Sequence, residues 1–345
     1  MSTELRDPVV WDDWHPVMQS TQLTLDAAKA AQLLGAALVL WRDSAGVVHA
    51  WEDRCPHRGT KLSMGTVSSL QGKDTLTCAY HGWVFGNSGR CQHIPALPQL
   101  GGSGGGNALT QSATVFNACE AYGLVWVCLG KPKGGVPLFP EFADTTLRKV
   151  VCGPYEVGSS GPRIVENFLD MAHFAPVHPG ILGDAAHAAV PDYQVEAFDQ
   201  PEFGAGIWAT LCRAWQPRSN SLAEGGSWVN YTYRVVRPLT AILTKEPAAQ
   251  TQFQEAISLH VQPLTPSTSR AWIILAMTNF EQSDDELRAF QDRIFSQDKP
   301  ILENQSPLLL PLAHGLENSV ACDRLSLAYR AYLSALGLRF GVIAQ

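Results

Sequence analysis

Short apolar runs separated by turn residues dominate the chain between residues 37 and 151. Residues 43–46 (Asp-Ser-Ala-Gly) and 87–89 (Asn-Ser-Gly) are typical of hairpin turns, because Asn and Gly tolerate the positive φ that such turns require. This pattern predicts a small all-β domain. The predicted strands cover residues 38–41, 47–51, 75–79, 83–85 and 123–129.

The hydrophobic pattern changes after Pro154. A helix is predicted from about residue 162 to 175, and strands rich in Trp, Tyr and Val are predicted within 207–237 and 257–277. We therefore expect the fold class α+β: an all-β N-terminal domain, then an α+β domain in which helices cover an antiparallel sheet. The expected bounds of the two domains are 1–152 and 153–345.

Two further helices are predicted towards the C-terminus. Residues 283–286 (Ser-Asp-Asp-Glu) form a capping-box sequence that begins a helix, and Pro300 is expected to stop or kink that helix. A last helix is expected from about Asp323 to Leu336, because Gly337 suits the left-handed conformation that ends many helices.

Composition and charge exclude several classes of protein. The chain has 345 residues, of which 46% are hydrophobic and 17% charged, and no segment approaches the length of a membrane span. A net charge of −7 without a Lys/Arg cluster argues against a nucleic-acid partner and favours a small-molecule substrate. The first 17 residues lack the features of a secretion signal, so we expect a cytoplasmic location. The glycine-rich residues 101–106 predict a surface loop.

The strongest chemical signal is a pair of short motifs, Cys-Pro-His-Arg-Gly at residues 55–59 and Cys-Ala-Tyr-His-Gly-Trp at 78–83. Two thiolates and two imidazoles bind zinc as well as iron, so a structural zinc site is one interpretation. Zinc sites usually take matched Cys or His pairs, whereas each motif here mixes one Cys with one His. That mixture is typical of a Rieske 2Fe-2S cluster, in which the cysteines hold one iron and the histidines the other. The predicted cluster ligands are Cys55, His57, Cys78 and His81.

Glycines and aromatic residues accompany both motifs. Gly59 and Gly82 stand where backbone amides must approach the cluster closely. Tyr80 and Trp83 either shield the cluster or belong to the core of the β domain, and the sequence leaves both interpretations open.

A second metal-binding motif lies at the end of the helix predicted for residues 162–175. Asp170 and His173 are three residues apart on one helical face, but His178 follows five residues later and would lie off this face. Pro176 is expected to end or kink the helix and to bring His178 to the same ion. Two imidazoles and one carboxylate are the ligands of mononuclear non-haem Fe(II) oxygenases. Histidines satisfied within the core are the alternative interpretation.

Five acidic residues are candidates for the carboxylate ligand: Asp170, Asp184, Asp298, Glu303 and Asp323. We prefer Asp298, because it lies near the C-terminal end of the capped helix, where the helix dipole disfavours an acid unless a cation compensates it. Asp323 is better explained as the N-cap of the last helix, and Asp170 as a bridge between metal sites. A solvated acid at a helix end is the alternative for Asp298.

Together these motifs resemble the oxygenase components of Rieske non-haem iron oxygenases over nearly the whole chain. Asn167, Asp170, His173 and His178 are similar to the family motif N-x2-D-x2-H-x4-H, which implies that Asn167 and Asp170 are catalytic residues and that the two histidines bind iron. Residues 295–303 resemble the Asp-Lys-bearing helix that supplies the third iron ligand in demethylating members. The branch resembled most contains methylxanthine N-demethylases and saxitoxin-pathway hydroxylases, with vanillate and dicamba O-demethylases further off.

The resemblance implies a monooxygenase of aromatic compound metabolism, which uses O2 to hydroxylate or oxidatively demethylate a small aromatic or nitrogen-heterocyclic substrate. It also implies a head-to-tail homotrimer in which the cluster of one chain faces the iron of the next. The sequence has no flavin, nicotinamide or plant-type ferredoxin motif. Electrons from NAD(P)H are therefore expected to arrive through a separate flavin/iron-sulfur reductase or a ferredoxin.

Three other functions are compatible with parts of this pattern. They are ring cis-dihydroxylation, electron transfer without oxygenase activity, and binding by a zinc-stabilised module. Pure electron transfer needs only the first 150 residues or so and leaves the second domain without a purpose. The substrate does not follow from the sequence, but aromatic residues of the second domain are candidates to line its cavity: Trp208, Trp215, Trp228, Tyr231 and Tyr233.

Overall fold

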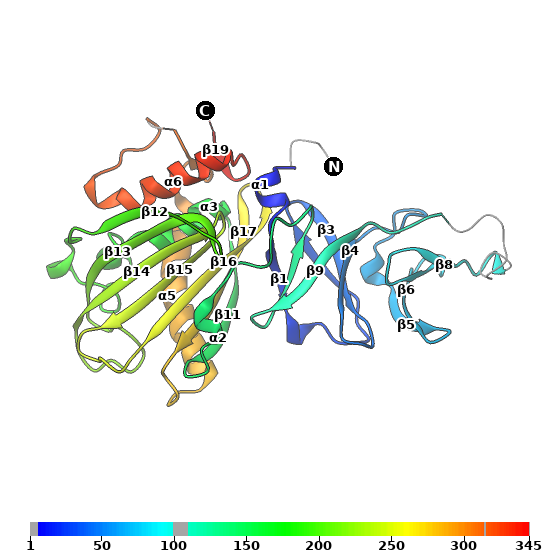
Figure 1. Ribbon diagram of the computed structural model, residues 1–345, viewed down its shortest axis with the longest axis horizontal. Helices are drawn as coiled ribbons and strands as arrows, with labels where there is room; N and C mark the ends of the chain where they lie inside the picture. Colours follow the sequence, from blue (N-terminus) through cyan, green and yellow to red (C-terminus); the bar gives the residue numbers. More distant parts are fainter. Residues whose placement is uncertain (1–5, 99–109, 314, 345) are drawn as a thin grey trace. The chain divides into compact units, whose positions relative to one another are not determined.

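The computed structural model describes residues 6–98, 110–313 and 315–344, so the loop expected at residues 101–106 lies outside the described residues. The chain divides into two compact units, Met1–Val136 and Pro137–Gln345. In Figure 1 the first unit runs from blue to cyan and the second from green to red.

The boundary between the units lies earlier than the expected 152/153. Strand β11 (Arg148–Val157) spans that point, and its Cys152 pairs with Ile273 in the sheet of the second unit. Pro154 lies where the register of β11 shifts, between Cys152 and Tyr155, and β11 is an edge strand. Because a bulge in an edge strand tolerates proline, the change of pattern at Pro154 marks a bulge and not a linker.

The first unit consists of two antiparallel sheets, one with the strand order β1-β10-β9-β4-β3-β2 and one with the order β5-β6-β7-β8. The strands predicted from the sequence correspond to β3, β4, β6, β7 and β10. The elements are α1 (Pro8–Trp11), β1 (His15–Gln19), β2 (Lys29–Leu33), β3 (Ala36–Arg42), β4 (Val48–Glu52), β5 (Thr66–Leu70), β6 (Lys73–Thr77), β7 (Val84–Gly86), β8 (Cys91–His93), β9 (Val115–Ala121) and β10 (Leu124–Cys128).

Both hairpin turns predicted for this unit are present. Gly46 joins β3 to β4 with φ of 84°, and Gly89 joins β7 to β8 with φ of 78°, a backbone region that favours glycine. The Asp43 carboxylate accepts a hydrogen bond of 2.8 Å from the Val47 amide and so closes the first turn. Both Cys-His motifs, at residues 55–59 and 78–83, lie along the chain between these two hairpins.

The second unit is built on one antiparallel sheet with the strand order β11-β17-β16-β15-β14-β13-β12. Apart from β11, neighbouring strands in this sheet are consecutive along the chain, so most of the sheet is a meander (Figure 1). After β11 its strands are β12 (Gln194–Gln200), β13 (Gly204–Gln216), β14 (Ser227–Arg237), β15 (Thr240–Pro247), β16 (Glu255–Thr265) and β17 (Thr268–Met277).

Helices pack against this sheet, as predicted. Helix α3 contacts β15, β16 and β17, α5 runs along β11 and contacts α3, and α6 lies on β12 and β13 (Figure 1). A short parallel pair, β18 (Leu310–Pro311) with β19 (Val342–Ile343), follows the chain towards its end. The helices are α2 (Pro140–Ala143), α3 (Gly161–Leu169), α4 (Phe174–Val177), α5 (Asp284–Asn304) and α6 (Arg324–Leu336).

The helix predicted for residues 162–175 ends earlier than expected. It breaks at Asp170, which has extended backbone angles, and not at Pro176. The Asp170 carboxylate accepts a 2.7 Å hydrogen bond from the Ala172 amide, a local contact that competes with continued helix. Pro176 is instead accommodated within the single turn of α4, where few backbone amides have a helical partner.

Pro300 does not stop α5, which was one of the two effects expected of it, the other being a kink. The helix begins at the predicted capping box of Ser283 and Glu286 and continues to Asn304. Asp298 and Leu302, which are buried on either side of Pro300, hold both halves of the helix against the unit, so packing outweighs the missing amide donor.

The last helix ends as predicted. Gly337 follows α6 in the left-handed conformation, with φ of 72°, and its amide caps the helix by donating to the carbonyls of Leu333 and Ser334. Among the described residues, no helix combines the length and the apolar composition needed to cross a membrane.

Candidate metal centres

The two Cys-His motifs of the first unit form matching turns. Cys55 follows β4 and Cys78 follows β6, and in each turn the glycine donates its amide to the cysteine carbonyl, at 2.8 Å for Gly59 and 3.1 Å for Gly82. Both glycines have a positive φ, of 75° and 67°. The two turns therefore have the same hydrogen-bonded framework, and glycine is required at the same place in each.

The four predicted cluster ligands differ in exposure. Cys55 and Cys78 are buried in the core of the unit, whereas His57 is half-buried and His81 is exposed. The two imidazole rings are neighbours, with centroids 4.5 Å apart. Two thiols on the inside and two imidazoles at the surface are the arrangement that a Rieske cluster requires, since each pair holds one iron.

Each of the two histidines has an aromatic ring beside it. Trp83 stacks on His57 with centroids 4.4 Å apart and an interplanar angle of 7°, and Tyr80 lies 3.8 Å from His81. Burial raises the pKa of Cys55 to about 11, although the His57 amide donates to its sulfur and opposes the shift. A buried thiolate next to a second cysteine needs a cationic partner, so this donor set fits an iron-sulfur cluster.

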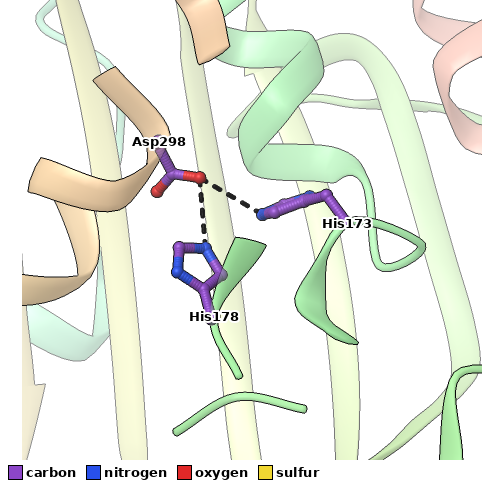
Figure 2. Close-up of side chains that lie close together, drawn as sticks. All are labelled: His173, His178 and Asp298. Atoms are coloured by element: carbon purple, nitrogen blue, oxygen red, sulfur yellow. Dashed lines mark ion pairs between the residues drawn. The ribbon is translucent and has the colours of Figure 1, made fainter. Parts of the chain in front are cut away.

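The second candidate centre brings together residues from the α3–α4 segment and from α5. His173, His178 and Asp298 each offer one ligand atom, and these atoms lie within 4.8 Å of one another. In Figure 2 both imidazoles point at the Asp298 carboxylate, with Nε2 of His173 at 3.4 Å and Nε2 of His178 at 3.1 Å from Oδ1. The three ligands chosen from the sequence are therefore adjacent in space.

This donor set fits a metal ion. Nε2 of His178 is buried and has no hydrogen-bond partner among the described residues, despite its closeness to Asp298. Burial disfavours a charged imidazole at His178, yet the Asp298 carboxylate outweighs burial and the pKa of His178 is raised. A site that attracts a proton to this ring has a negative potential, and a metal cation would satisfy both the potential and the unpaired Nε2.

Neighbouring polar groups orient the three ligands. Nδ1 of His178 lies 2.9 Å from Oε1 of Gln297, Nδ1 of His173 lies 3.3 Å from Oδ2 of Asp170, and Nδ2 of Asn167 donates to Asp298 at 3.3 Å. An acceptor at Nδ1 favours the tautomer in which Nε2 carries no proton and is free to bind a metal. Asn167 and Asp170 therefore contact two of the candidate metal ligands.

Gln297 was not singled out by the sequence analysis. It directly precedes Asp298 on α5, so it faces His178 only because that helix packs beside the α3–α4 segment. A glutamine on an amphipathic helix gives no signal of such a role. The adjacent carboxylate ligand is the one feature of the sequence that would have directed attention to it.

The other candidate carboxylates have partners elsewhere. Asp184 accepts from His187, Glu303 accepts from the Gly158 amide at 2.9 Å, and Asp323 accepts from the Val320 amide at 2.8 Å. Asp170 contacts His173 but does not belong to the three side chains, His173, His178 and Asp298, whose ligand atoms lie close enough together to hold one metal ion. The pKa of Asp170 lies below its usual value, because contact with the His173 imidazole and nearby amides outweighs burial.

The triad lines one wall of a cavity between the sheet and α5. The rest of the cavity wall is mainly apolar. The cavity is partly open to solvent, and its empty space, including the open mouth, is about 680 Å³. Of the five aromatic candidates only Tyr231 lines this cavity, whereas Tyr233 is buried behind it and Trp215 packs against Trp228. Apolar lining residues include Phe168, Leu243, Ile257, Leu259, Ile294 and Phe295.

Two protein families match the chain, one in each of its two units. The Rieske 2Fe-2S domain family matches residues 13–112, and the family of vanillate O-demethylase oxygenase C-terminal domains matches residues 157–339. Methylxanthine N1-demethylase NdmA of Pseudomonas putida is 32% identical over 338 residues, which cover 94% of this chain and 88% of that protein. The chain belongs to the Rieske non-haem iron oxygenases.

Other known proteins are also similar to this Rieske oxygenase. A probable methylxanthine N7-demethylase, NdmC of Pseudomonas sp. (strain TJI-51), is 40% identical over 220 residues, 64% of this chain and 77% of that protein. The solved structure of NdmA with caffeine superimposes with a TM-score of 0.79 at 29% identity, covering 96% of this chain and 92% of that one. The oxidoreductase NdmD of Pseudomonas putida shares 34% identity over 124 residues, 36% of this chain and 20% of that protein.

Membership of the Rieske non-haem iron oxygenases shows which cofactors this protein uses and which class of reaction it catalyses. The Rieske oxygenase uses a 2Fe-2S cluster and a mononuclear non-haem iron, and it is a terminal oxygenase that hydroxylates or demethylates small substrates. The similarity to the oxidoreductase NdmD indicates that a separate reductase is its partner. The predicted fold class and family are thereby confirmed.

Substitution of Gln297 tests how the oxygenase orients His178. Gln297→Leu removes the acceptor for the Nδ1 proton, so affinity for the mononuclear iron should fall about 10- to 100-fold. Gln297→Glu keeps an acceptor at the same place and should retain the iron. The measurement is iron content after dialysis against a graded chelator, with cluster absorbance as the internal standard. Equal iron retention in Gln297→Leu and wild type would show that this contact does not orient the ligand.

Proposed function

We propose that this chain is the oxygenase of a demethylating system and that His173, His178 and Asp298 hold its mononuclear iron. The observation that carries the proposal is the convergence of these three side chains in one cavity, with the buried Nε2 of His178 left unpaired. The ligands proposed for the cluster are Cys55, His57, Cys78 and His81.

The proposed reaction is hydroxylation of an N-methyl group on a small ring compound. One oxygen atom of O2 enters a C–H bond of the methyl group, and the other leaves as water after taking two electrons from the reductase and two protons. The N–CH2OH product then breaks its C–N bond, which releases formaldehyde and returns the proton to nitrogen. Support comes from the relatives, since NdmA, NdmB and NdmC are all named as methylxanthine demethylases.

The side chains of this chain prepare the site for that reaction. When bound, the iron activates dioxygen and the cluster supplies the electrons. Gln297 and Asp170 accept the Nδ1 protons of His178 and His173, which keeps both Nε2 atoms free and correctly oriented. Asn167 donates to Oδ1 of Asp298 and holds that carboxylate in place.

The cavity wall positions the substrate and limits the access of water. Phe168, Leu243 and Phe295 present apolar surface beside the triad, so a flat ring is held by contact with carbon atoms and its methyl group is directed at the metal centre. Exclusion of water also limits reduction of O2 that is not coupled to the substrate.

We further propose the homotrimer, in which Asp170 joins the two centres of neighbouring chains. One carboxylate oxygen contacts His173, and Asp170 borders a surface hollow whose lining includes Asn318, Ser319 and Arg330. Leu316 and Val320, which are 59% and 64% exposed, offer apolar surface for a second copy. In this arrangement His81 of the partner subunit would donate its ring N–H to Asp170.

The proposed electron source is NAD(P)H, through a flavin/iron-sulfur reductase or a ferredoxin in the cytoplasm. His57 and His81 lie at the surface of the first unit, where an electron-transfer partner can reach the cluster edge. Tyr80, which is 62% exposed beside His81, is part of the surface available to this partner.

Reconstitution of turnover tests the proposed reaction. The purified chain with NADH alone should be inactive, because its electrons are proposed to arrive through a separate reductase, and should become active with an added reductase or a chemical reductant. Compounds labelled in an N-methyl carbon should release labelled formaldehyde in an amount equal to the demethylated product. A cis-diol as the main product, or turnover with NADH and no partner, would contradict the proposal.

Substitution of Asp170 tests the path between the two centres. Asp170→Asn keeps an oxygen for the Ala172 amide but weakens the hydrogen bonds to the two imidazoles, each by something like 1 to 3 kcal/mol. Cluster absorbance and mononuclear iron should stay normal, while product formation and the rate at which the reduced cluster is reoxidised fall at least about tenfold.

Asp184→Asn is the matched control for this substitution. Asp184 and His187 form a second i, i+3 pair, with Asp184 Oδ1 2.9 Å from Nδ1 of His187, outside the metal centre. The control should keep wild-type turnover. Loss of mononuclear iron from Asp170→Asn, with iron retained in Asp298→Ala, would mean that the ligand and the bridge have been exchanged.

A further inference from the structure

A buried ion pair lies at the edge of the active-site cavity, away from the metal triad: Lys245 lines this cavity, and Glu255 lines the hollow beside it. Lys245 on β15 and Glu255 on β16 are direct cross-strand partners, and Lys245 is only 4% exposed. Nζ of Lys245 is 3.6 Å from Oε2 of Glu255, which is longer than a hydrogen bond. Oε2 of Glu255 is itself buried and has no hydrogen-bond partner among the described residues.

A buried ion pair with this geometry is expected to contribute little to the stability of the sheet. Removing two charges from water is costly, and the mutual attraction offsets the cost only when hydrogen bonds satisfy the remaining donors and acceptors. Burial lowers the pKa of Lys245 and raises that of Glu255, with each charge opposing the shift of the other. The pair therefore calls for a role other than stability.

Lys245 forms the polar end of an otherwise apolar cavity. It lines the same cavity as His173, His178 and Asp298, together with Gln291 of α5. Gln291 is itself buried, at 8% exposure. Gln291 is seven residues before Asp298 on one continuous helix, which separates the two by about 10 Å along the helix axis. A molecule of one or two rings spans this distance.

The charges at this end decide which substrates are favoured. The pair is neutral as a whole, so a neutral oxygen acceptor gains a charge-assisted hydrogen bond from the ammonium and adds no net charge to the cavity. A substrate carboxylate would bring a second anion close to Glu255 and lose much of that gain. A carbonyl group in a ring meets the requirement, and Gln291 can donate to a neighbouring ring oxygen or accept from a ring N–H.

We propose that Lys245 is the substrate anchor of this cavity, donating to a ring carbonyl of a neutral lactam or imide, and that Glu255 positions its ammonium group. This inference rests on the proposed function for the location of the reaction. It adds the class of substrate and the residue that selects it. The anchored carbonyl places the opposite edge of the ring, with its methyl group, towards His173, His178 and Asp298.

The test measures binding without turnover, in protein kept free of O2. The probes are caffeine and other N-methylated lactams and imides, 9-methylpurine as a fused ring without carbonyl groups, and vanillate as a carboxylate. Wild type should bind the carbonyl compounds about tenfold or more tightly than 9-methylpurine, and more tightly than vanillate. In Lys245→Met combined with Glu255→Gln, this preference should disappear while binding of 9-methylpurine stays the same.

A matched cross-strand pair of the same sheet is the control. Arg270 and Glu156 pair across β17 and β11 at 2.6 Å, with side chains 30% and 68% exposed. Arg270→Met combined with Glu156→Gln should leave the preference unchanged. The thermal midpoint of the Lys245 and Glu255 double variant should stay close to that of wild type, because both buried charges are removed together and neither is left without its partner.

Three results would overturn the proposal: an unchanged preference in the double variant, tighter binding of vanillate than of caffeine by wild type, or no binding of any carbonyl compound. A double variant with a lowered thermal midpoint and an unchanged preference would assign the pair a structural role instead. Because binding is measured without turnover, a bound lactam that releases no formaldehyde under O2 with reductant contradicts the proposed reaction and leaves the anchor intact.

Discussion

Two imidazoles and a carboxylate from distant parts of the sequence meet in this protein inside an apolar cavity, and that convergence constrains most of the second unit. Helix α3 has to end at Asp170, so that His173 and His178 can face the same point from a looser segment. Helix α5 has to pass beside that segment, with Asp298 buried and pointing inward. The sheet supplies the opposite wall of the cavity, on which Tyr231 and Lys245 lie.

Burial of polar groups at the candidate metal centre is tolerated because the outer atoms of the ligand side chains have defined partners. The imidazoles of His173 and His178 are held at Nδ1, and Asp298 is held by Asn167, so the atoms that converge at the centre are those left for a metal. The candidate cluster site in the first unit differs from this enclosed centre, since its cysteines are buried and its histidines reach the surface. Under the proposed ligand assignment, electrons enter at the exposed edge of the first unit and are used in the cavity of the second.

The sequence was most informative where chemistry restricts the choice of residues. Mixed Cys-His pairs with a glycine after each, and a capping box at Ser283, predict local structure that depends on few neighbours. It was less informative where packing decides. The helix break at Asp170 depends on a carboxylate that bonds the Ala172 amide, and the passage of α5 through Pro300 depends on burial of Asp298 and Leu302. Neither Gln297 nor the Lys245–Glu255 pair has a motif, since each acquires its role only from the element packed opposite.

The most direct test of the two metal centres is a crystal structure of the iron-loaded protein with anomalous data collected at the iron absorption edge. We expect two iron positions close together between Cys55, His57, Cys78 and His81, and a separate single iron bound by His173, His178 and Asp298. Asp170 should lie beside this single iron without binding it. A single iron held by Asp170 in place of Asp298, or the absence of iron from the three-residue centre in active protein, would show that the ligands are assigned wrongly.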